Sequence, residues 1–250
     1  MNIFGLNPIE NLRRRLNAVF GVFILSAACC GCGALMTFVL APNQAIQANR
    51  ISHLPAMSVA DVGTATAGET ILITGAISGT PPNPEIVEFI AYAGEKWIVT
   101  IPSDSDPDGS SEPFGSWKHI PTVVPELSLE MDSQLVPIHT ANNVRLYGAL
   151  HELVIPGDST LSANYEGKPV SDGTIRYHGL DNGAITTVLG KKAANGGVDP
   201  EQIFAGDRAA FENSQRQATS GFLISGIFSF IMAPIVLVGG LLAVLFWRRR

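Results

Sequence analysis

The chain has 250 residues, of which 46% are hydrophobic and 15% are charged, and its formal net charge is −6. Between the basic clusters at positions 13–15 and 248–250 it holds 10 Lys and Arg against 21 Asp and Glu, a net charge of −11. A segment of that charge repels phosphate, which argues against nucleic acid as a partner.

Residues 1–18 form a basic tail, and residues 19–41 are an apolar run without Asp, Glu, Lys or Arg. The run exceeds the ~20 residues that an α-helix needs to cross a bilayer, so it predicts a first transmembrane helix. A cleaved signal peptide is the alternative, but its apolar region is usually about 7 to 15 residues long. A lipid anchor on Cys29 is a second alternative, although the chain stays apolar for another dozen positions.

All three cysteines, Cys29, Cys30 and Cys32, lie in this run. The middle of the chain therefore has no internal disulfide. Cys29 and Cys32 have the spacing of a redox or metal motif, but small residues surround them, and small residues let membrane helices approach closely. Helix packing is the favoured interpretation.

Residues 42–68 are predicted to be a linker, and residues 69–198 a β-domain, because short β-type runs alternate there with turn residues. Runs at 86–93 and 96–101 predict a hairpin that turns at Ala93-Gly94-Glu95. Further strands are expected at 69–77, 127–129, 135–139, 144–153, 174–178 and 184–191. The fold class is therefore two transmembrane helices flanking an all-β domain, a small barrel or a sandwich.

Asp199, Pro200 and Glu201 are typical of a helix start, which predicts a juxtamembrane helix at 199–220. It leads into a second uncharged apolar run, residues 221–247, the second predicted transmembrane helix, and a basic tail at 248–250. Ser225, Ser229 and Ala233 offer a face of small residues, so we expect helix pairing within or between chains.

The basic clusters lie on the outer flanks of both apolar runs, which places both termini in the cytoplasm and the acidic β-domain outside it. Short basic tails suit a bacterial plasma (inner) membrane.

The order of these parts resembles the BAM domain, also called GIDE, of membrane-anchored RING ubiquitin ligases and their prokaryotic relatives. The residues that carry the resemblance are Gly75-Ala76-Ile77, Trp117, Val136-Pro137-Ile138, the stretch 183–190 and the stretch 203–207. The resemblance implies an extracytoplasmic interaction domain between two anchors. We expect no ubiquitin ligase activity, because the sequence lacks the cysteine and histidine pairs of a RING.

One polar motif indicates a possible metal. Asp104, Asp106, Asp108 and Gly109 match the start of a calcium-binding EF-hand loop, and Glu112 adds another oxygen ligand. The bidentate glutamate of that loop is replaced by Gly115, and Asp, Pro and Gly are also ordinary turn residues. Weak calcium binding and a solvated turn are both open.

The five histidines show no metal-binding spacing, although His139 and His151 could meet across adjacent strands. No phosphate-binding or nucleophile motif occurs, so whether the chain is an enzyme stays uncertain, with binding favoured. We predict an accessory or scaffold subunit whose partners are the lipid bilayer and either another integral membrane protein or a second copy. An exported membrane-bound hydrolase and a calcium-dependent surface module are the alternatives.

Overall fold

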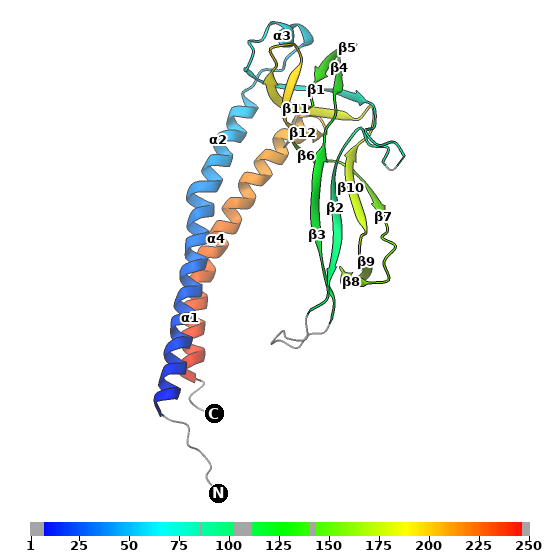
Figure 1. The fold of residues 1–250 in the computed structure, drawn as a ribbon. Helices are drawn as coiled ribbons and strands as arrows, with labels where there is room; N and C mark the ends of the chain where they lie inside the picture. The colour runs from blue at the N-terminus through cyan, green and yellow to red at the C-terminus, as the bar shows by residue number, and fades with distance from the viewer. Residues whose placement is uncertain (1–7, 86, 103–111, 141–143, 247–250) are drawn as a thin grey trace. The chain divides into compact units, whose positions relative to one another are not determined.

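A computed structural model describes residues 8–85, 87–102, 112–140 and 144–246 (Figure 1). The chain divides into two compact units. One is helical and combines the N-terminal part, through His53, with the C-terminal part from Glu212 onward. The other, Leu54–Phe211, holds all the described strands.

The N-terminal helix of the helical unit is longer than the predicted span. α1 (Pro8–Leu35) continues through a π-helical turn, η1 (Met36–Leu40), into α2 (Ala41–Ser52). In that turn the Ala41 N–H bonds to the carbonyl of Met36, five residues back. The next residue, Pro42, has no N–H and would clash with a carbonyl four residues back in a regular helix, which accounts for the wider turn.

The predicted linker at 42–68 is therefore wrong in most of its length. Residues through Ser52 extend the first helix, and Val59–Thr64 forms a short helix, α3. Ser58 caps α3, because its hydroxyl accepts the N–H of Asp61 while the Asp61 carboxylate accepts the N–H of Ser58. Apolar periodicity does not predict α2, because this helix is rich in Ala, Asn and Gln.

The second long helix, α4 (Arg208–Phe246), pairs with α1 inside the helical unit. The Ser26 hydroxyl donates to the Ala233 carbonyl at 2.9 Å. Gly33 lies against the Gly226 carbonyl, and Gly240 lies against Val22. The expected helix pairing is thus found within the chain. Its close face follows Gly226, Ala233 and Gly240 at seven-residue spacing and includes Ser229 and Ala233 of the predicted face, whereas Ser225 is exposed.

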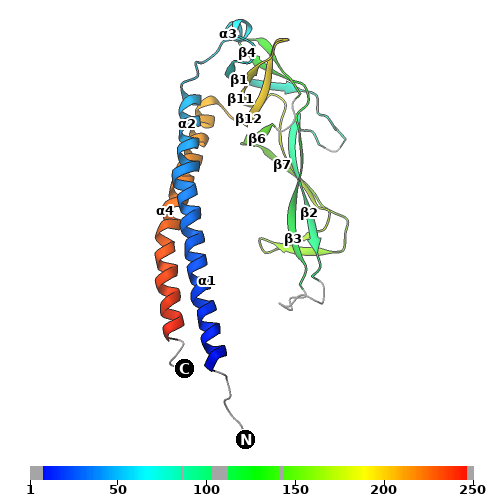
Figure 2. The ribbon, with the colours of Figure 1, turned by 60° about the vertical axis from the view of Figure 1, so that its left-hand side comes forward.

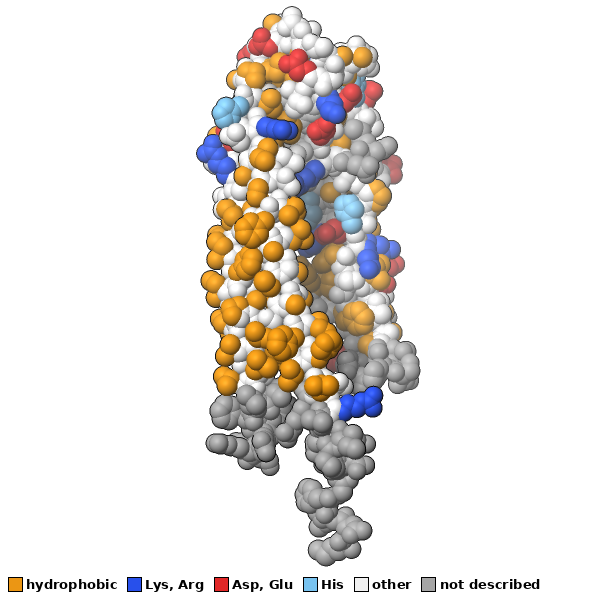
Figure 3. Space-filling view, turned by 90° about the vertical axis from the view of Figure 1, so that its left-hand side faces the viewer, with side chains coloured by type: hydrophobic (Ala, Val, Ile, Leu, Met, Phe, Trp, Pro, Cys, Tyr) orange, Lys and Arg blue, Asp and Glu red, His pale blue; other side chains and the backbone are white. Residues whose placement is uncertain are grey.

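Most apolar side chains of these two helices are exposed. The stretches Leu16–Ser52 and Arg208–Ala243 are long and apolar enough to cross a membrane, and only 6% and 11% of their most apolar windows are buried. Figure 3 shows hydrophobic side chains covering this face of the pair. The exposed large apolar side chains of the two helices include Phe20, Phe23, Ile24, Phe38, Ile224, Phe228, Ile231 and Ile235.

Five strands of the other unit close into a barrel. They are β1 (Thr70–Gly79), β4 (Leu127–Met131), β5 (Gln134–Ile138), β12 (Val198–Ala205) and β11 (Ile185–Lys192), and β11 pairs with both β12 and β1. Their inward residues, among them Ile71, Ile73, Leu129, Val188 and Ile203, are fully buried. β6 (Arg145–Gly148) runs parallel to β12 beside this ring.

A second sheet of four strands has the order β3 (Phe114–Val123), β2 (Ala91–Thr100), β10 (Ile175–Leu180) and β7 (His151–Ile155) (Figure 1). Its long strands β2 and β3 lie side by side in Figure 2 as well. A separate hairpin joins β8 (Ser162–Tyr165) to β9 (Lys168–Ser171). The predicted hairpin at 86–101 is wrong: Gly94 lies inside one continuous strand, where the ring of Tyr177 covers it. Ile86 lies outside the described residues.

The predicted helix start at Asp199 is also wrong. Residues 198–205 form β12, because long-range pairing with β11 and burial of Ile203 and Phe204 outweigh the local helix signal. Pro200 is accommodated where the β11–β12 register shifts. The helix begins at Arg208, where Asp207 Oδ1 accepts the Ala210 N–H at 2.8 Å. Strands therefore extend to Ala205, beyond the predicted boundary at 198.

Candidate functional site

One face of the four-stranded sheet gathers charged, aromatic and imidazole side chains. Alternation along β2 puts Ala93, Glu95 and Trp97 on the same face. The register places His119 of β3 directly opposite Glu95, and Trp117 opposite Trp97. On the other side of β2, Arg176 of β10 is opposite Glu95 and His178 is opposite Ala93.

Arg176 and Glu95 form the central ion pair of this face. Both the Nε and Nη2 atoms of Arg176 lie 2.6 Å from Glu95 Oε2. Partial burial alone would lower the pKa of the Arg176 guanidinium, but hydrogen bonds to Glu95 and Tyr165 outweigh it and raise that pKa above its usual value. The guanidinium stays charged, and its two hydrogen bonds hold the carboxylate in place.

Aromatic side chains cover the half of the face around Trp97. Trp97 is 2% exposed and packs with Val99 against Ala163 of the β8–β9 hairpin. The rings of Trp97, Trp117 and Tyr165 contact one another at centroid distances of 5.1 to 5.8 Å. This half is a small core, and it fixes the strands that carry the polar half.

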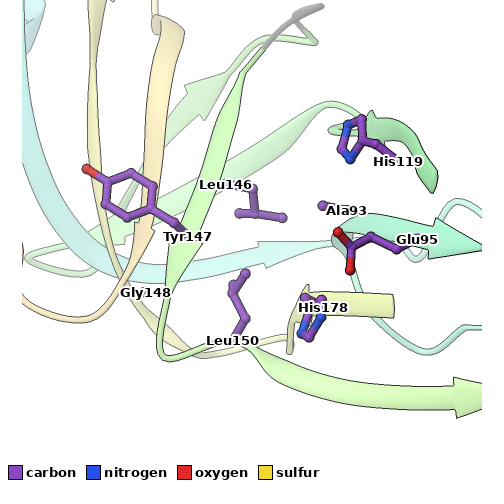
Figure 4. A pocket seen from close by; sticks show the side chains of 8 residues that line it. All are labelled: Ala93, Glu95, His119, Leu146, Tyr147, Gly148, Leu150 and His178. Carbon is purple, nitrogen blue, oxygen red and sulfur yellow. The ribbon is translucent and has the colours of Figure 1, made fainter. Parts of the chain in front are cut away.

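The other half of the face opens into a hollow of about 340 Å³. Glu95, His119 and His178 reach it from three neighbouring strands, and Leu146 and Leu150 line the opposite side (Figure 4). The ring of Tyr147 points away from the hollow, and its hydroxyl donates to Gln202 at 2.7 Å.

This hollow combines hydrogen-bonding groups with an apolar wall. The imidazoles of His119 and His178 each offer one donor and one acceptor when neutral, and Glu95 offers its second carboxylate oxygen. Such a mixture suits a polar ligand or a protruding side chain of a partner with one apolar side. We take it as the candidate binding site.

A second, larger hollow of about 840 Å³ is acidic. Glu85, Glu88, Glu152 and Asp181 line it together with His151, whose Nδ1 contacts the Asp181 carboxylate. The side chain of His151 is 72% exposed. An exposed contact of this kind contributes little to stability.

The predicted metal residues are only partly visible in the structure. Asp104, Asp106 and Asp108 lie outside the described residues, and Glu112, at the edge of the described part, is exposed. Within the described ranges, no group of three His, Cys, Asp or Glu side chains is arranged to hold a metal ion. The calcium hypothesis therefore stays a prediction.

His139 and His151 do not share a site. His139 Nε2 lies 2.6 Å from the Gly196 carbonyl, and His151 contacts Asp181. The structure instead brings His119 and His178 to one hollow, although they are 59 positions apart in sequence. Strand alternation indicates the face of each histidine, but only the register β3-β2-β10 shows that they share it.

No protein-family model, curated protein or solved structure matches this chain.

Proposed function

We propose that this protein is anchored in a membrane by two helices and presents its β-rich unit outside the cytoplasm as a binding module, an accessory subunit for another membrane protein. The observation that carries the proposal is the exposure of apolar side chains along both paired helices. Soluble monomers rarely expose apolar patches larger than a few hundred Å².

Length supports a membrane role for both helices. At 1.5 Å per residue, the uncharged runs at 19–41 and 221–247 span about 34 and 40 Å, against a hydrocarbon core of about 30 Å. The pairing face also suits a bilayer. Helices in lipid associate by close packing and not by the hydrophobic effect, and Gly33 and Gly226 allow such close packing.

The proposed orientation rests on charge. The basic clusters at 13–15 and 248–250 flank the apolar runs on their outer sides, and cytoplasmic flanks are enriched in Lys and Arg. The helix–β-domain–helix order is also that of the BAM/GIDE proteins, and we propose that the chain is related to them. We place it in a bacterial plasma membrane.

The binding role rests on the hollow formed by Glu95, His119 and His178. Removing water from these polar groups costs free energy. They therefore favour a partner whose own polar groups replace the lost hydrogen bonds to water.

Topology is tested by cysteine labelling of intact cells. In a variant whose three native cysteines are replaced by alanine, we introduce Lys168→Cys, at an exposed position of β9. A membrane-impermeant maleimide should label it in intact cells, whereas Asn2→Cys in the N-terminal tail should react only after lysis. The reverse pattern would contradict the proposed orientation.

The binding role is tested by cross-linking in the native membrane. A photo-reactive amino acid at His119 should cross-link to one discrete membrane protein, which mass spectrometry then identifies. The same amino acid at Lys168, on the β8–β9 hairpin, is the matched control and should give no such product. Absence of a product from His119, or equal products from both sites, would count against this face as the docking surface.

A further inference from the structure

A groove between α2 and α4 in the helical unit is polar at one end and apolar at the other, as a phospholipid is. Its volume is about 330 Å³. Eight residues line it: Ala45, Ala48, Asn49 and Ser52 of α2, and Arg216, Thr219, Ser220 and Leu223 of α4. The two helices run antiparallel, so Ala45 and Leu223 lie at the end nearer the apolar runs, and Ser52 and Arg216 lie at the other end (Figure 1).

We propose that this groove binds one anionic phospholipid, with the phosphate at Arg216 and Asn49 and an acyl chain beside Leu223. The inference rests on the proposed membrane anchoring. The guanidinium of Arg216 offers a fork of donors that matches phosphate oxygens, and the Asn49 amide offers two more donors. Across the described ranges, the structure gives neither side chain a hydrogen bond or ion pair within the protein.

The neighbouring hydroxyls are not competing donors, because their hydrogens are already used. Ser52 donates to the Asn49 carbonyl at 2.9 Å, Thr219 to the Gln215 carbonyl and Ser220 to the Gln217 carbonyl. Their oxygens are left to accept hydrogen bonds from a glycerol-type headgroup. Arg216 and Asn49 are thus the two groove residues with donors left for an anion.

Distance along the helix places Arg216 at the level of lipid phosphates. It precedes the apolar run that starts at Gly221 by five residues, about 7.5 Å of helix. The headgroup layer is about 5 to 7.5 Å thick on each side of the hydrocarbon core, so Arg216 lies near its outer edge. Arg50, the neighbour of Asn49 on α2, does not line the groove.

Small residues keep the groove open to an acyl chain. Ala45 and Ala48 contribute only methyl groups, and Leu223 is 40% exposed. A free phosphate ion would use the Arg216 end alone, whereas a phospholipid uses both ends. The charge of the groove and its apolar end together favour the lipid.

The test is native mass spectrometry of the full chain in detergent, titrated with phosphatidylglycerol. We expect one lipid to bind more tightly than the rest, and Arg216→Gln to weaken it about fivefold, the effect of one cation near a lipid phosphate. Arg50→Gln, the matched control on the same helix pair, should change binding less than twofold. Equal losses in both variants, or none in either, would overturn the proposal.

Three further measurements distinguish the groove from other lipid sites, a phospholipid from a free anion, and this inference from the proposed anchoring. Ala48→Leu fills the groove without changing its charge and should abolish tight lipid binding. Retention of tight binding in this variant would overturn the groove as the site. Millimolar inorganic phosphate should not displace the lipid; displacement would assign the site to a free anion. Alkaline carbonate extraction tests the anchoring separately: release from membranes would refute the proposed function, whereas retention without a tight lipid would refute only this inference.

Discussion

The guanidinium of Arg176 lies 4.2 Å from the centroid of the Trp117 ring. Arg176 belongs to β10 and Trp117 to β3, so the side chain reaches across the whole width of β2. It bonds Glu95 of β2 on the way and comes within 5.8 Å of the Tyr165 ring of β8. One side chain therefore joins three strands and a hairpin beside the candidate binding site.

Arg176→Ala should destabilise the β-domain by about 2 kcal/mol, because it removes a partly buried cation–π contact and leaves Glu95 without its partner. Arg176→Lys keeps the charge but not the planar stack and should recover only part of the loss. Thermal unfolding followed by tryptophan fluorescence measures both variants.

Arg145→Ala is the matched control for that experiment. Arg145 lies 4.6 Å from the Tyr147 ring but is exposed, so its loss should cost about 0.5 to 1 kcal/mol. If the Arg176 and Arg145 variants melt alike, the stack on Trp117 has no special role.

Gly115→Ala should destabilise the same sheet by about 1 to 3 kcal/mol through overpacking. The Trp97 indole lies over Gly115, and an added Cβ would come 2.8 Å from its Nε1 and still closer to its ring carbons. Gly63→Ala in α3 is the control, since its Cβ meets nothing within 4 Å and alanine favours a helix. Equal unfolding midpoints for parent and Gly115→Ala would show that the indole moves aside freely.

The sequence predicts the parts of this fold that local pattern determines. Two uncharged apolar runs predict the long helices, and alternation predicts strands such as β11, whose inward Val188 is fully buried. Capping signals are less reliable: Asp199-Pro200 is typical of a helix start, yet these residues lie in β12. The helix begins at a second cap, Asp207, eight residues later.

The candidate site could not be predicted in the same way, because it depends on register. His119 and Glu95 share a hollow only because β3 pairs with β2 at that position, and a slip of one residue would turn His119 to the opposite face. From the sequence, only His139 and His151 are suggested as a pair, and the structure places these two at separate sites. No local feature distinguishes the two pairs of histidines.

The stabilisation by the α3 cap should depend on pH. The hydrogen bonds from the Ser58 hydroxyl and from the Ser58 backbone N–H lower the pKa of the Asp61 carboxyl below its usual 3.8. A carboxyl with a lower pKa in the folded state stabilises the protein above the unfolded-state pKa, and this contribution is lost as pH falls through the folded-state pKa. The loss therefore begins near pH 3.8 and continues below it.

The measurement compares the melting temperatures of the parent and Asp61→Ala at pH 7 and at successively lower pH. We expect the parent to melt higher at pH 7 and the difference to shrink below about pH 3.8. Asp158→Ala, an exposed acid outside the helices and strands, is the control. A difference that grows on acidification would have the wrong sign for a cap made by the ionised carboxylate.

Gly226→Val should separate α1 from α4. A Cβ at Gly226 would overlap the Thr37 hydroxyl and lie 3.1 Å from the Thr37 backbone nitrogen, so the helices must move apart. The readout is disulfide formation between Ser26→Cys and Ala233→Cys, introduced after the native cysteines are replaced by alanine, because the Ser26 hydroxyl lies 2.9 Å from the Ala233 carbonyl. Gly239→Val, where a Cβ meets nothing within 4 Å, should leave the cross-linking yield unchanged. A similar yield in both valine variants would mean that close approach at Gly226 does not hold the pair together, whereas a selective loss would identify the glycine contact as the element that does.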